Sequence, residues 1–143
     1  MTVLFSKKCE LALQSVLYLS ILPKGTIESA DNISKQIKAP REFVSKILQS
    51  LTDVDIIKSK KGKFGGFSLA KDPKEIKLID IITAIDGDYV FDSCVMGFPG
   101  CSDENPCPMH EKWAKLREES LQMLSTNTLA DLYEITKRKI EKI

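Results

Sequence analysis

Three cysteines stand close together in the second half of the chain. Cys94, Cys101 and Cys107 are separated by six and five residues, and His110 follows three positions after the last. Thiolate sulfur binds soft and borderline metals, and a loop rich in proline and glycine can fold its sulfurs around a centre that a helix cannot surround. If a helix begins near Cys107, this cysteine and His110 are neighbours on one face and could serve the same ligand. The spacing therefore predicts a metal centre in this loop.

The spacing of the cysteines leaves the kind of centre open. Structural zinc sites usually pair cysteines two to four residues apart, and this loop has no pair so close. An iron–sulfur cluster, a zinc ion held by three cysteines and a histidine, and redox-reactive thiols without a metal are all compatible with it. A disulfide framework does not fit, because cytosolic thiols are kept reduced and a core of this size needs no covalent staple. The fourth cysteine, Cys9, lies in an apolar helical segment, where we expect it to pack rather than to bind a metal.

The length and composition of the chain predict one core with an appendage. The sequence has 143 residues, of which 43% are hydrophobic, which suffices for one good core but not for two full domains. It contains no run of about 18 apolar residues that could span a bilayer, and no secretory cleavage site follows the N-terminal apolar stretch. We therefore expect a cytoplasmic protein that is not bound to a membrane.

Three stretches near the N-terminus have the apolar spacing of helices. They cover residues 4–22, 29–37 and 40–51, and the second and third are joined by a turn at residues 38–40. In the third, the stripe expected to be buried consists of Phe43, Val44, Ile47, Leu48 and Leu51. Two short helices joined by a tight turn form a helix-turn-helix, whose second helix enters the major groove of DNA.

A lysine-rich hairpin is predicted directly after these helices. Residues 56–60 and 67–71 alternate as strands do, and the glycines between them supply the positive φ values of a tight turn. Four lysines gather at this hairpin: Lys58, Lys60, Lys61 and Lys63. Residues 1–71 hold 12 Lys and Arg against 6 Asp and Glu, a net charge of +6, whereas residues 72–143 hold 9 against 14, a net charge of −5. Only the first part is therefore suited to a polyanion, and the hairpin is predicted to be a wing that meets DNA phosphates.

The second half is predicted to be helical on both sides of an irregular loop. Residues 78–85 form a linker helix, and residues 108–124 and 128–140 form helices. Residues 88–110, which include the cysteines, lose all periodicity, and a loop of this length in a small domain indicates a function. The long C-terminal helical segment has little core of its own to pack on, so we expect it to form the interface of a homodimer.

These elements together predict the fold class and two regions. The fold is mainly α with a small β-hairpin, namely a winged helix-turn-helix followed by a long C-terminal dimerisation helix. Residues 1–75 form the winged helix-turn-helix DNA-binding region. Residues 76–143 form the linker helix, the cysteine loop (88–110) and the dimerisation helix.

Five segments of the chain match the pattern of a known family. They are Phe5-Ser-Lys-Lys-Cys-Glu-Leu-Ala-Leu13, Lys60-Lys-Gly-Lys-Phe-Gly-Gly-Phe-Ser-Leu69, residues 81–86, the three cysteines and Thr128-Leu-Ala-Asp-Leu132. With these segments, which span nearly the whole chain, the sequence resembles the IscR/NsrR regulators, winged-helix dimers of bacteria, some of which carry an iron–sulfur cluster. The cysteine loop is the most specific of the five and the wing is the next. The resemblance favours an iron–sulfur cluster over zinc.

The resemblance also implies which residues hold the cluster. In the family, three cysteines of this loop are ligands, which implies Cys94, Cys101 and Cys107 here. IscR-like members add a histidine of the same loop, which His110 matches, whereas NsrR-like members add an acidic residue of the first helix, donated by the partner subunit, which Glu10 matches. Apart from the resemblance, Glu10 could form a surface ion pair and His110 could cap a helix. The fourth ligand stays open, as does the choice between a two-iron and a four-iron cluster.

A second set of residues is implied to contact a double-stranded DNA operator. By resemblance, the second helix of the pair reads bases through Glu42, Ser45, Lys46 and Gln49. Phosphates or the minor groove are bound by Arg41 and the wing lysines Lys60, Lys61 and Lys63. Phe64 stands in the wing where relatives often have glycine, and the resemblance gives it no contact.

The predicted function is that of a DNA-binding transcription regulator. We expect a repressor that senses redox state, nitric oxide or iron–sulfur status through its cluster. The alternative is a zinc-stabilised winged-helix interaction module without cluster sensing. An enzyme is not expected, because the chain has one histidine, no glycine-rich phosphate loop and no nucleophile–base pair beyond Cys107 and His110.

Overall fold

The first helix of the chain begins at a serine cap. The computed structural model describes residues 4–143, apart from the side chains of residues 89 and 90. α1 (Lys7–Ser20) follows Ser6, whose hydroxyl accepts a hydrogen bond from the backbone N–H of Cys9 at 3.0 Å. This bond satisfies an N–H that the helix itself leaves unpaired. α1 is shorter than the predicted helix at both ends, because Ser6 caps its start and Pro23 follows soon after its end.

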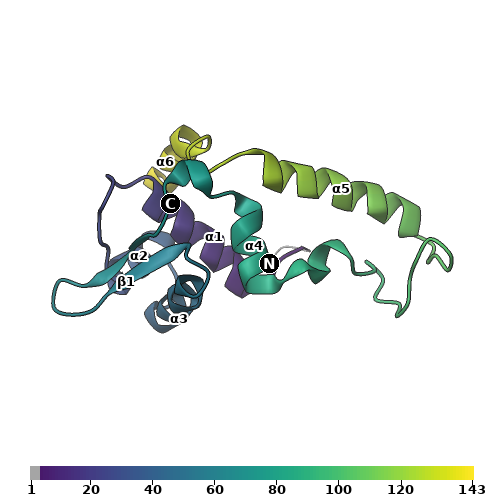
Figure 1. Cartoon of the computed structure of the whole chain (residues 1–143), viewed down its shortest axis with the longest axis horizontal. Coiled ribbons are helices and arrows are strands. Elements are labelled where there is room, and N and C mark those ends of the chain that lie inside the picture. Colours follow the sequence, from purple (N-terminus) through teal and green to yellow (C-terminus); the bar gives the residue numbers. More distant parts are fainter. Residues whose placement is uncertain (1–3) are drawn as a thin grey trace.

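α2 (Ala30–Ile37) and α3 (Arg41–Thr52) form the predicted helix pair. Ser29 caps α2, and its side chain accepts a hydrogen bond from the backbone three residues further on at 3.1 Å. Lys38 ends α2 in the left-handed region, with a φ of 55°. Pro40, whose fixed φ and missing N–H suit a helix start, stands directly before α3. The turn between the two helices is therefore tight, and α1, α2 and α3 all contact one another (Figure 1).

One hydrophobic core joins the three helices to the hairpin. The fully buried residues of α3 are Val44, Ile47, Leu48 and Leu51, and they pack with Val16 of α1 and Ile33 of α2. The prediction that Phe43 belongs to this stripe is wrong, because its side chain is exposed. Neighbouring residues on a helix point about 100° apart, so the helix that buries Val44 turns the residue before it toward the surface.

The turn end of β2 is fastened to the loop between α1 and α2. β1 (Ile57–Lys60) and β2 (Gly66–Leu69) pair antiparallel. The side chain of Phe67 is buried, and its backbone exchanges two hydrogen bonds with Glu28, of 2.7 and 2.9 Å. A Cβ atom at Gly66 would overlap the backbone of Glu28, so this close approach requires glycine. Beyond this contact with Glu28, the turn of the hairpin projects away from the helices (Figure 1).

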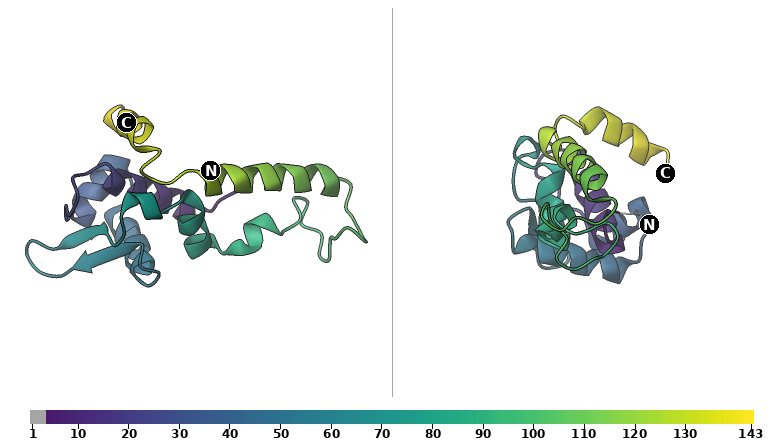
Figure 2. Two further views of the ribbon diagram at one scale, coloured as in Figure 1. Left: turned by 45° about the horizontal axis from the view of Figure 1, so that its top comes forward. Right: turned by 90° about the vertical axis from the view of Figure 1, so that its right-hand side faces the viewer.

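The second half of the chain extends away from the three-helix core and then returns. Its elements are η1 (Pro73–Glu75), α4 (Leu78–Asp86), η2 (Asp88–Phe91), α5 (His110–Thr126) and α6 (Tyr133–Glu141). α5 contacts α4 and η2, and α6 contacts α1. The outer end of α5 and the loop before it reach far beyond the rest of the molecule (Figure 2).

A small apolar cluster docks the inner end of α5. Its buried members are Cys9 of α1, Ile82 of α4 and Leu124 of α5. Leu124 is also the buried residue that the structure records for α5, so most of this long helix faces solvent in the single chain. The position of the loop at its outer end therefore depends on α5 being held at its inner end.

The last helix starts five residues later than predicted. Thr128 and Asp131 form a reciprocal pair, in which each backbone N–H donates to the other's side chain at 2.9 and 3.2 Å. The N–H of Leu129 donates to the carbonyl of Ile76 at 2.8 Å. These backbone groups are engaged in a turn and a bridge to the chain before α4, and the helix begins only at Tyr133.

The architecture confirms the predicted fold class. The chain is mostly helical, and one two-stranded antiparallel hairpin follows the helix-turn-helix. None of the helices within residues 4–143 combines the length and the apolar character needed to cross a membrane.

Replacing Ile47 by alanine is expected to lower the free energy of unfolding by about 2–5 kcal/mol, because it leaves a cavity in the core. Urea unfolding followed by circular dichroism measures the change. Lys46→Ala, at the exposed neighbouring position, is the control and should stay within about 0.5 kcal/mol of the parent. Equal losses in the two variants would contradict the burial of this stripe.

Candidate functional site

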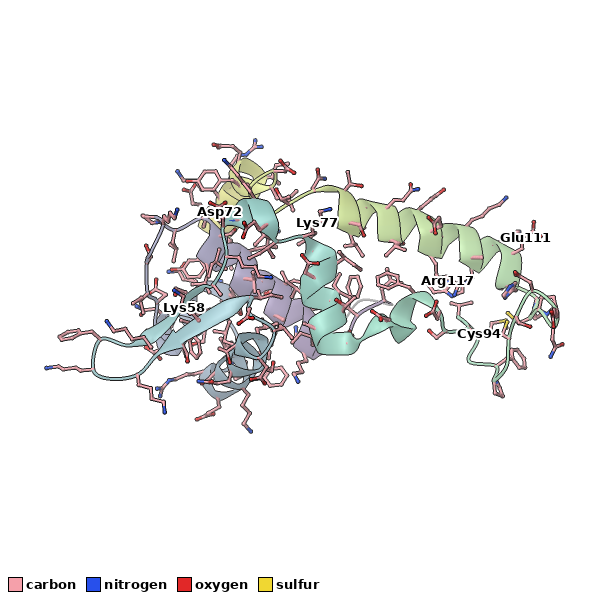
Figure 3. The ribbon with its side chains drawn as sticks, viewed as in Figure 1. Lys58, Asp72, Lys77, Cys94, Glu111 and Arg117 are labelled. Atoms are coloured by element: carbon pink, nitrogen blue, oxygen red, sulfur yellow. The ribbon has the colours of Figure 1, made fainter. Side chains whose placement is uncertain are left out.

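The three cysteines of the loop converge on one point. The Sγ atoms of Cys94, Cys101 and Cys107 all lie within 4.8 Å of one another, and those of Cys94 and Cys107 are 3.4 Å apart. Gly97 and Gly100 take positive φ values of 79° and 68°, which lets the chain fold back on itself between the cysteines. Cys94 lies near the outer end of α5, far from the hairpin (Figure 3).

Two side chains of α5 hold the segment that leads into the loop. The indole N–H of Trp113 donates to the carbonyl of Ser93 at 2.8 Å, and the guanidinium of Arg117 donates to the carbonyl of Phe91 at 2.8 Å. Both side chains line a small pocket together with the three cysteines and His110. Sequence reasoning missed Trp113 and Arg117. Trp113 follows His110 by three residues and Arg117 follows Trp113 by four. This spacing is the pattern of one helix face and could have revealed them.

His110 lies between a cysteine and a carboxylate. Its Nδ1 is 3.2 Å from the Sγ of Cys101, and its Nε2 is 2.8 Å from the carboxylate of Asp103. The predicted neighbour Cys107 contributes its carbonyl, which accepts the backbone N–H of His110 at 3.1 Å. A carboxylate on the far ring nitrogen orients a histidine whose near nitrogen serves a metal. His110 therefore adjoins one of the three cysteines, but it is not part of the group whose ligand atoms all lie within 4.8 Å of one another.

Arg117 leaves a buried hydrogen-bond donor at the pocket. Within the described chain its Nε is buried and has no hydrogen-bond partner. A buried donor without a partner costs free energy unless a ligand supplies the acceptor. A metal group held by thiolates carries negative charge and sulfur acceptors. The three thiols and this cation thus fit an anionic metal–thiolate group.

The pocket that the three cysteines share with His110, Trp113 and Arg117 is small, whereas a pocket of about 240 Å³ borders Cys101 and Cys107 on another side. The small pocket encloses about 10 Å³, roughly the volume of one water probe. A tetrahedral ion with bonds of about 2.3 Å to sulfur holds its sulfurs about 3.8 Å apart. A group of two or four irons requires the loop to widen. Residues 92–109 form neither helix nor strand, so no ladder of backbone hydrogen bonds opposes such a movement.

The loop thiols differ in acidity. Burial disfavours the thiolate of Cys94, but hydrogen bonds from the backbone of Phe98 and Met96 and from the thiol of Cys107 lower the pKa of Cys94 to about 7. Burial raises the pKa of Cys107. At neutral pH, Cys94 therefore supplies a thiolate to an electrophile or a metal more readily than Cys107 does.

Cys9 and Glu10 lie in α1, away from the loop. Cys9 is fully buried, as predicted, and burial together with the neighbouring carboxylate of Asp86 raises its pKa to about 12. Glu10 pairs with Lys7 at 3.6 Å. α1 begins beside α4, whereas the loop lies beyond the outer end of α5 (Figures 1 and 2). A carboxylate ligand from Glu10 thus requires a second copy of the chain.

The candidate DNA-contacting residues lie on α3 and on the hairpin that packs beside it. Four residues of α3 are exposed, namely Arg41, Glu42, Lys46 and Gln49, and Ser45 is half-buried. The wing lysines Lys60, Lys61 and Lys63 are exposed as well. α3 buries one face in the core and presents the other to solvent, which is what a helix that enters the major groove must do.

A helix-turn-helix followed by a basic hairpin defines a winged-helix DNA-binding protein. Residues 5–135 match the model of the family Rrf2, described as an iron-dependent transcriptional regulator. The chain belongs to the Rrf2 family.

Relatives and solved structures agree with this assignment. The chain is 32% identical over 139 residues to an HTH-type transcriptional regulator of Aquifex aeolicus strain VF5, and the match covers 96% of both chains. It is 31% identical over 108 residues to the regulator IscR of Yersinia pseudotuberculosis, covering 76% of this chain and 65% of that protein. CymR, the global cysteine regulator of B. subtilis, superimposes with a TM-score of 0.75 at 21% identity over 92% of this chain and 96% of that one. The IscR of T. potens superimposes with a TM-score of 0.70 at 22% identity, over 90% of this chain and 85% of that one. The resemblance to winged-helix regulators of the IscR/NsrR type is confirmed, and the chain is a transcriptional regulator of this family.

In reduced, metal-free protein, iodoacetamide near neutral pH is expected to label Cys94 before Cys107 and to leave Cys9 unmodified. The thiolate is the reactive form, whereas the thiol of Cys9 is buried and its pKa is raised to about 12. Timed labelling with peptide mass spectrometry measures the order. Labelling in urea is the control, because unfolding must expose Cys9. Native labelling of Cys9 as fast as that of Cys94 would contradict the site described here.

Proposed function

We propose that the chain is a repressor which binds a double-stranded DNA operator as a homodimer and adjusts this binding through an iron–sulfur cluster. The observation that carries the proposal is the convergence of Cys94, Cys101 and Cys107 within 4.8 Å, in a chain of a family described as iron-dependent. Such a regulator works in the cytoplasm, where the operator lies and thiols are kept reduced.

The residues of the loop and α5 have separate tasks in this proposal. The three cysteines hold the cluster, which supplies iron chemistry that responds to oxidants and nitric oxide. His110, or Glu10 of the partner subunit, completes the ligand set. Arg117 balances the negative charge through its unpaired Nε, and the hydrogen bond from Trp113 to Ser93 keeps the first cysteine close to α5.

A physical path connects the loop to the DNA-binding helix. The loop continues from η2, which follows α4, and α4 packs on both α1 and α3. The carboxylate of Asp86 at the end of α4 accepts hydrogen bonds from the backbone and the hydroxyl of Ser6, at 2.9 and 2.5 Å. In this proposal a change in the loop moves the end of α4, and α4 packs directly against α3. Coupling between two sites needs such a shared element.

The exposed face of α5 supports the homodimer. Met109, directly before α5, and Leu116 and Met123 within it follow one another at intervals of seven residues, and their exposed fractions are 43%, 54% and 61%. Apolar residues at this spacing form one stripe along a helix, which is the pattern of a helix that pairs with another. Pairing through this stripe gives α5 the partner that its own chain does not provide, and it brings a second α1 with its Glu10 within the same assembly.

A zinc-stabilised winged-helix module is the second candidate. The observation in its favour is the close approach of the sulfurs, since 3.4 Å between Cys94 and Cys107 suits one tetrahedral ion better than a cluster. In that case the loop is a structural unit, and operator binding does not respond to oxidants through iron.

Protein purified without oxygen is expected to contain iron and acid-labile sulfide and to absorb visible light. It should bind a DNA duplex selected from a random library. Replacing Cys94, Cys101 and Cys107 by alanine should remove the iron and change the Kd for this duplex by about 5- to 150-fold, the usual range of coupling between sites. Cys9→Ala is the matched control, since it removes a cysteine outside the loop and should retain iron. Visible and electron paramagnetic resonance spectra of Glu10→Ala and His110→Ala then identify the fourth ligand as the residue whose loss alters the spectrum.

The outcomes of this experiment separate the parts of the proposal. Colourless protein with zinc establishes the second candidate. Protein without iron whose triple cysteine variant binds the duplex like the parent refutes cluster sensing and leaves operator binding intact. Failure to select any duplex refutes the proposed function as a whole.

Leu116→Glu should convert the homodimer into a monomer, because it places a charge in the middle of the apolar stripe. Light scattering after gel filtration measures the mass, and circular dichroism checks that the helices persist. Lys115→Glu introduces the same residue at the neighbouring exposed position and should leave the mass unchanged. A parent protein that is already monomeric, or a dimer that survives Leu116→Glu, would contradict this interface.

A further inference from the structure

An aromatic side chain stands at the tip of the basic hairpin. Phe64 is 82% exposed, the largest exposed fraction among the big apolar side chains that the structure describes outside the core. Exposed lysines surround it in the sequence, at positions 60, 61 and 63, and residues 57–71 contain no acidic residue. The ammonium group of Lys63 lies 5.7 Å from the centre of the Phe64 ring. An apolar ring is thus presented to solvent within a strongly cationic surface.

The hairpin holds this ring in a defined position. The turn is closed by a hydrogen bond of 3.0 Å from the N–H of Gly65 to the carbonyl of Gly62. Gly62 has a φ of 107°, which a residue with a side chain rarely adopts. The strand end next to the turn is fastened by the buried Phe67 and its two hydrogen bonds to Glu28. The ring therefore projects from a framework anchored in the core rather than from a loose loop.

The length of the hairpin matches the spacing of the grooves of DNA. Strand β1 and half of the turn cover residues 57–62, which extend roughly 15–20 Å at about 3.3 Å per residue. When a helix occupies the major groove, the centre of the next minor groove lies about 17 Å away along the duplex, half of a helical turn. Because α3 and β1 are packed together, the hairpin is long enough to span this distance.

We infer that Phe64 enters the minor groove beside the α3 site and makes an apolar contact with sugars and base edges there. This inference rests on the operator binding proposed above. The minor groove is about 6 Å wide, so it admits a side chain but not the hairpin itself. Apolar side chains also contact the minor groove in architectural DNA-binding proteins. Lys60, Lys61 and Lys63 bind the phosphates along both edges of the groove.

The contribution of Phe64 differs in kind from that of the lysines. A lysine on a phosphate releases a counterion, so its loss lowers the dependence of affinity on salt. An apolar contact releases none, so its loss weakens binding equally at every salt concentration. Salt dependence therefore separates the two types of residue without any knowledge of the operator sequence.

The test uses the full-length protein and a duplex selected from a random library. Phe64→Ala should raise the Kd by about tenfold or more, as expected for an aromatic side chain that leaves an apolar contact, with the slope of log Kd against log salt unchanged. Lys61→Ala, the matched control, should lower that slope by about one unit. Phe64→Leu should restore most of the affinity and Phe64→Ser should not, because only leucine keeps the apolar contact.

A change in the DNA locates the contact. Replacing adenine by 2,6-diaminopurine adds an amino group to the minor groove and leaves the major groove unaltered. In the minor groove beside the α3 site, this change should weaken DNA binding by the parent protein and have little effect on DNA binding by Phe64→Ala. Equal effects on both proteins, or a Phe64→Ala variant that binds like the parent, would overturn the inference even though the parent binds the duplex. A parent that binds no duplex would instead refute the proposed function.

Discussion

The junction of α1, α4 and α5 is the contact on which the rest of the structure depends. Its centre is the buried cluster of Cys9, Ile82 and Leu124, and its edge is the pair of hydrogen bonds from Ser6 to Asp86. The DNA-binding helices lie on one side of this junction and the cysteine loop lies on the other. The junction holds the inner end of α5, and Trp113 and Arg117 hold the helix to the segment before the loop, so these contacts together fix where the loop stands relative to α3. Burial of Cys9 within it also explains why this thiol is inert while the loop thiols are accessible.

The loop owes its chemistry to a lack of regular structure. A helix or strand directs neighbouring side chains to different faces, whereas turns at Gly97 and Gly100 allow three thiols to meet. The same irregularity makes the site adjustable, because few backbone hydrogen bonds must break when it changes size. α5 limits this freedom at one edge through Trp113 and Arg117. A site that is rigid at the helix and adjustable in the loop is suited to binding a group that it must also be able to release or alter.

Much of the fold and part of the site could be predicted from the sequence, and the failures have physical causes. Helical periodicity located α2 and α3 to within a residue because their caps and apolar stripes agree. Phe43 was misplaced because its apolar character was counted, although the stripe begins one residue later. The turn before α6 was missed because Thr128 and Asp131 bond to each other's backbone, which periodicity does not detect. The cysteines were evident from their clustering, whereas Trp113 and Arg117 act through geometry that only the folded chain provides.

In the proposed function, the choice of fourth ligand decides how a cluster would be coupled to the operator. His110 already faces Cys101 and is oriented by Asp103, so a histidine ligand keeps the site within one chain and lets each subunit respond alone. A ligand from Glu10 of the partner subunit would bind the loop of one chain to the α1 of the other, and losing the cluster would then loosen the dimer as well as the loop. Because Glu10 follows Cys9 and adjoins the Ser6–Asp86 contact, that loosening would act directly on the junction that positions α3. In the proposed function, coupling between cluster and operator would therefore be stronger with the carboxylate as ligand than with the histidine.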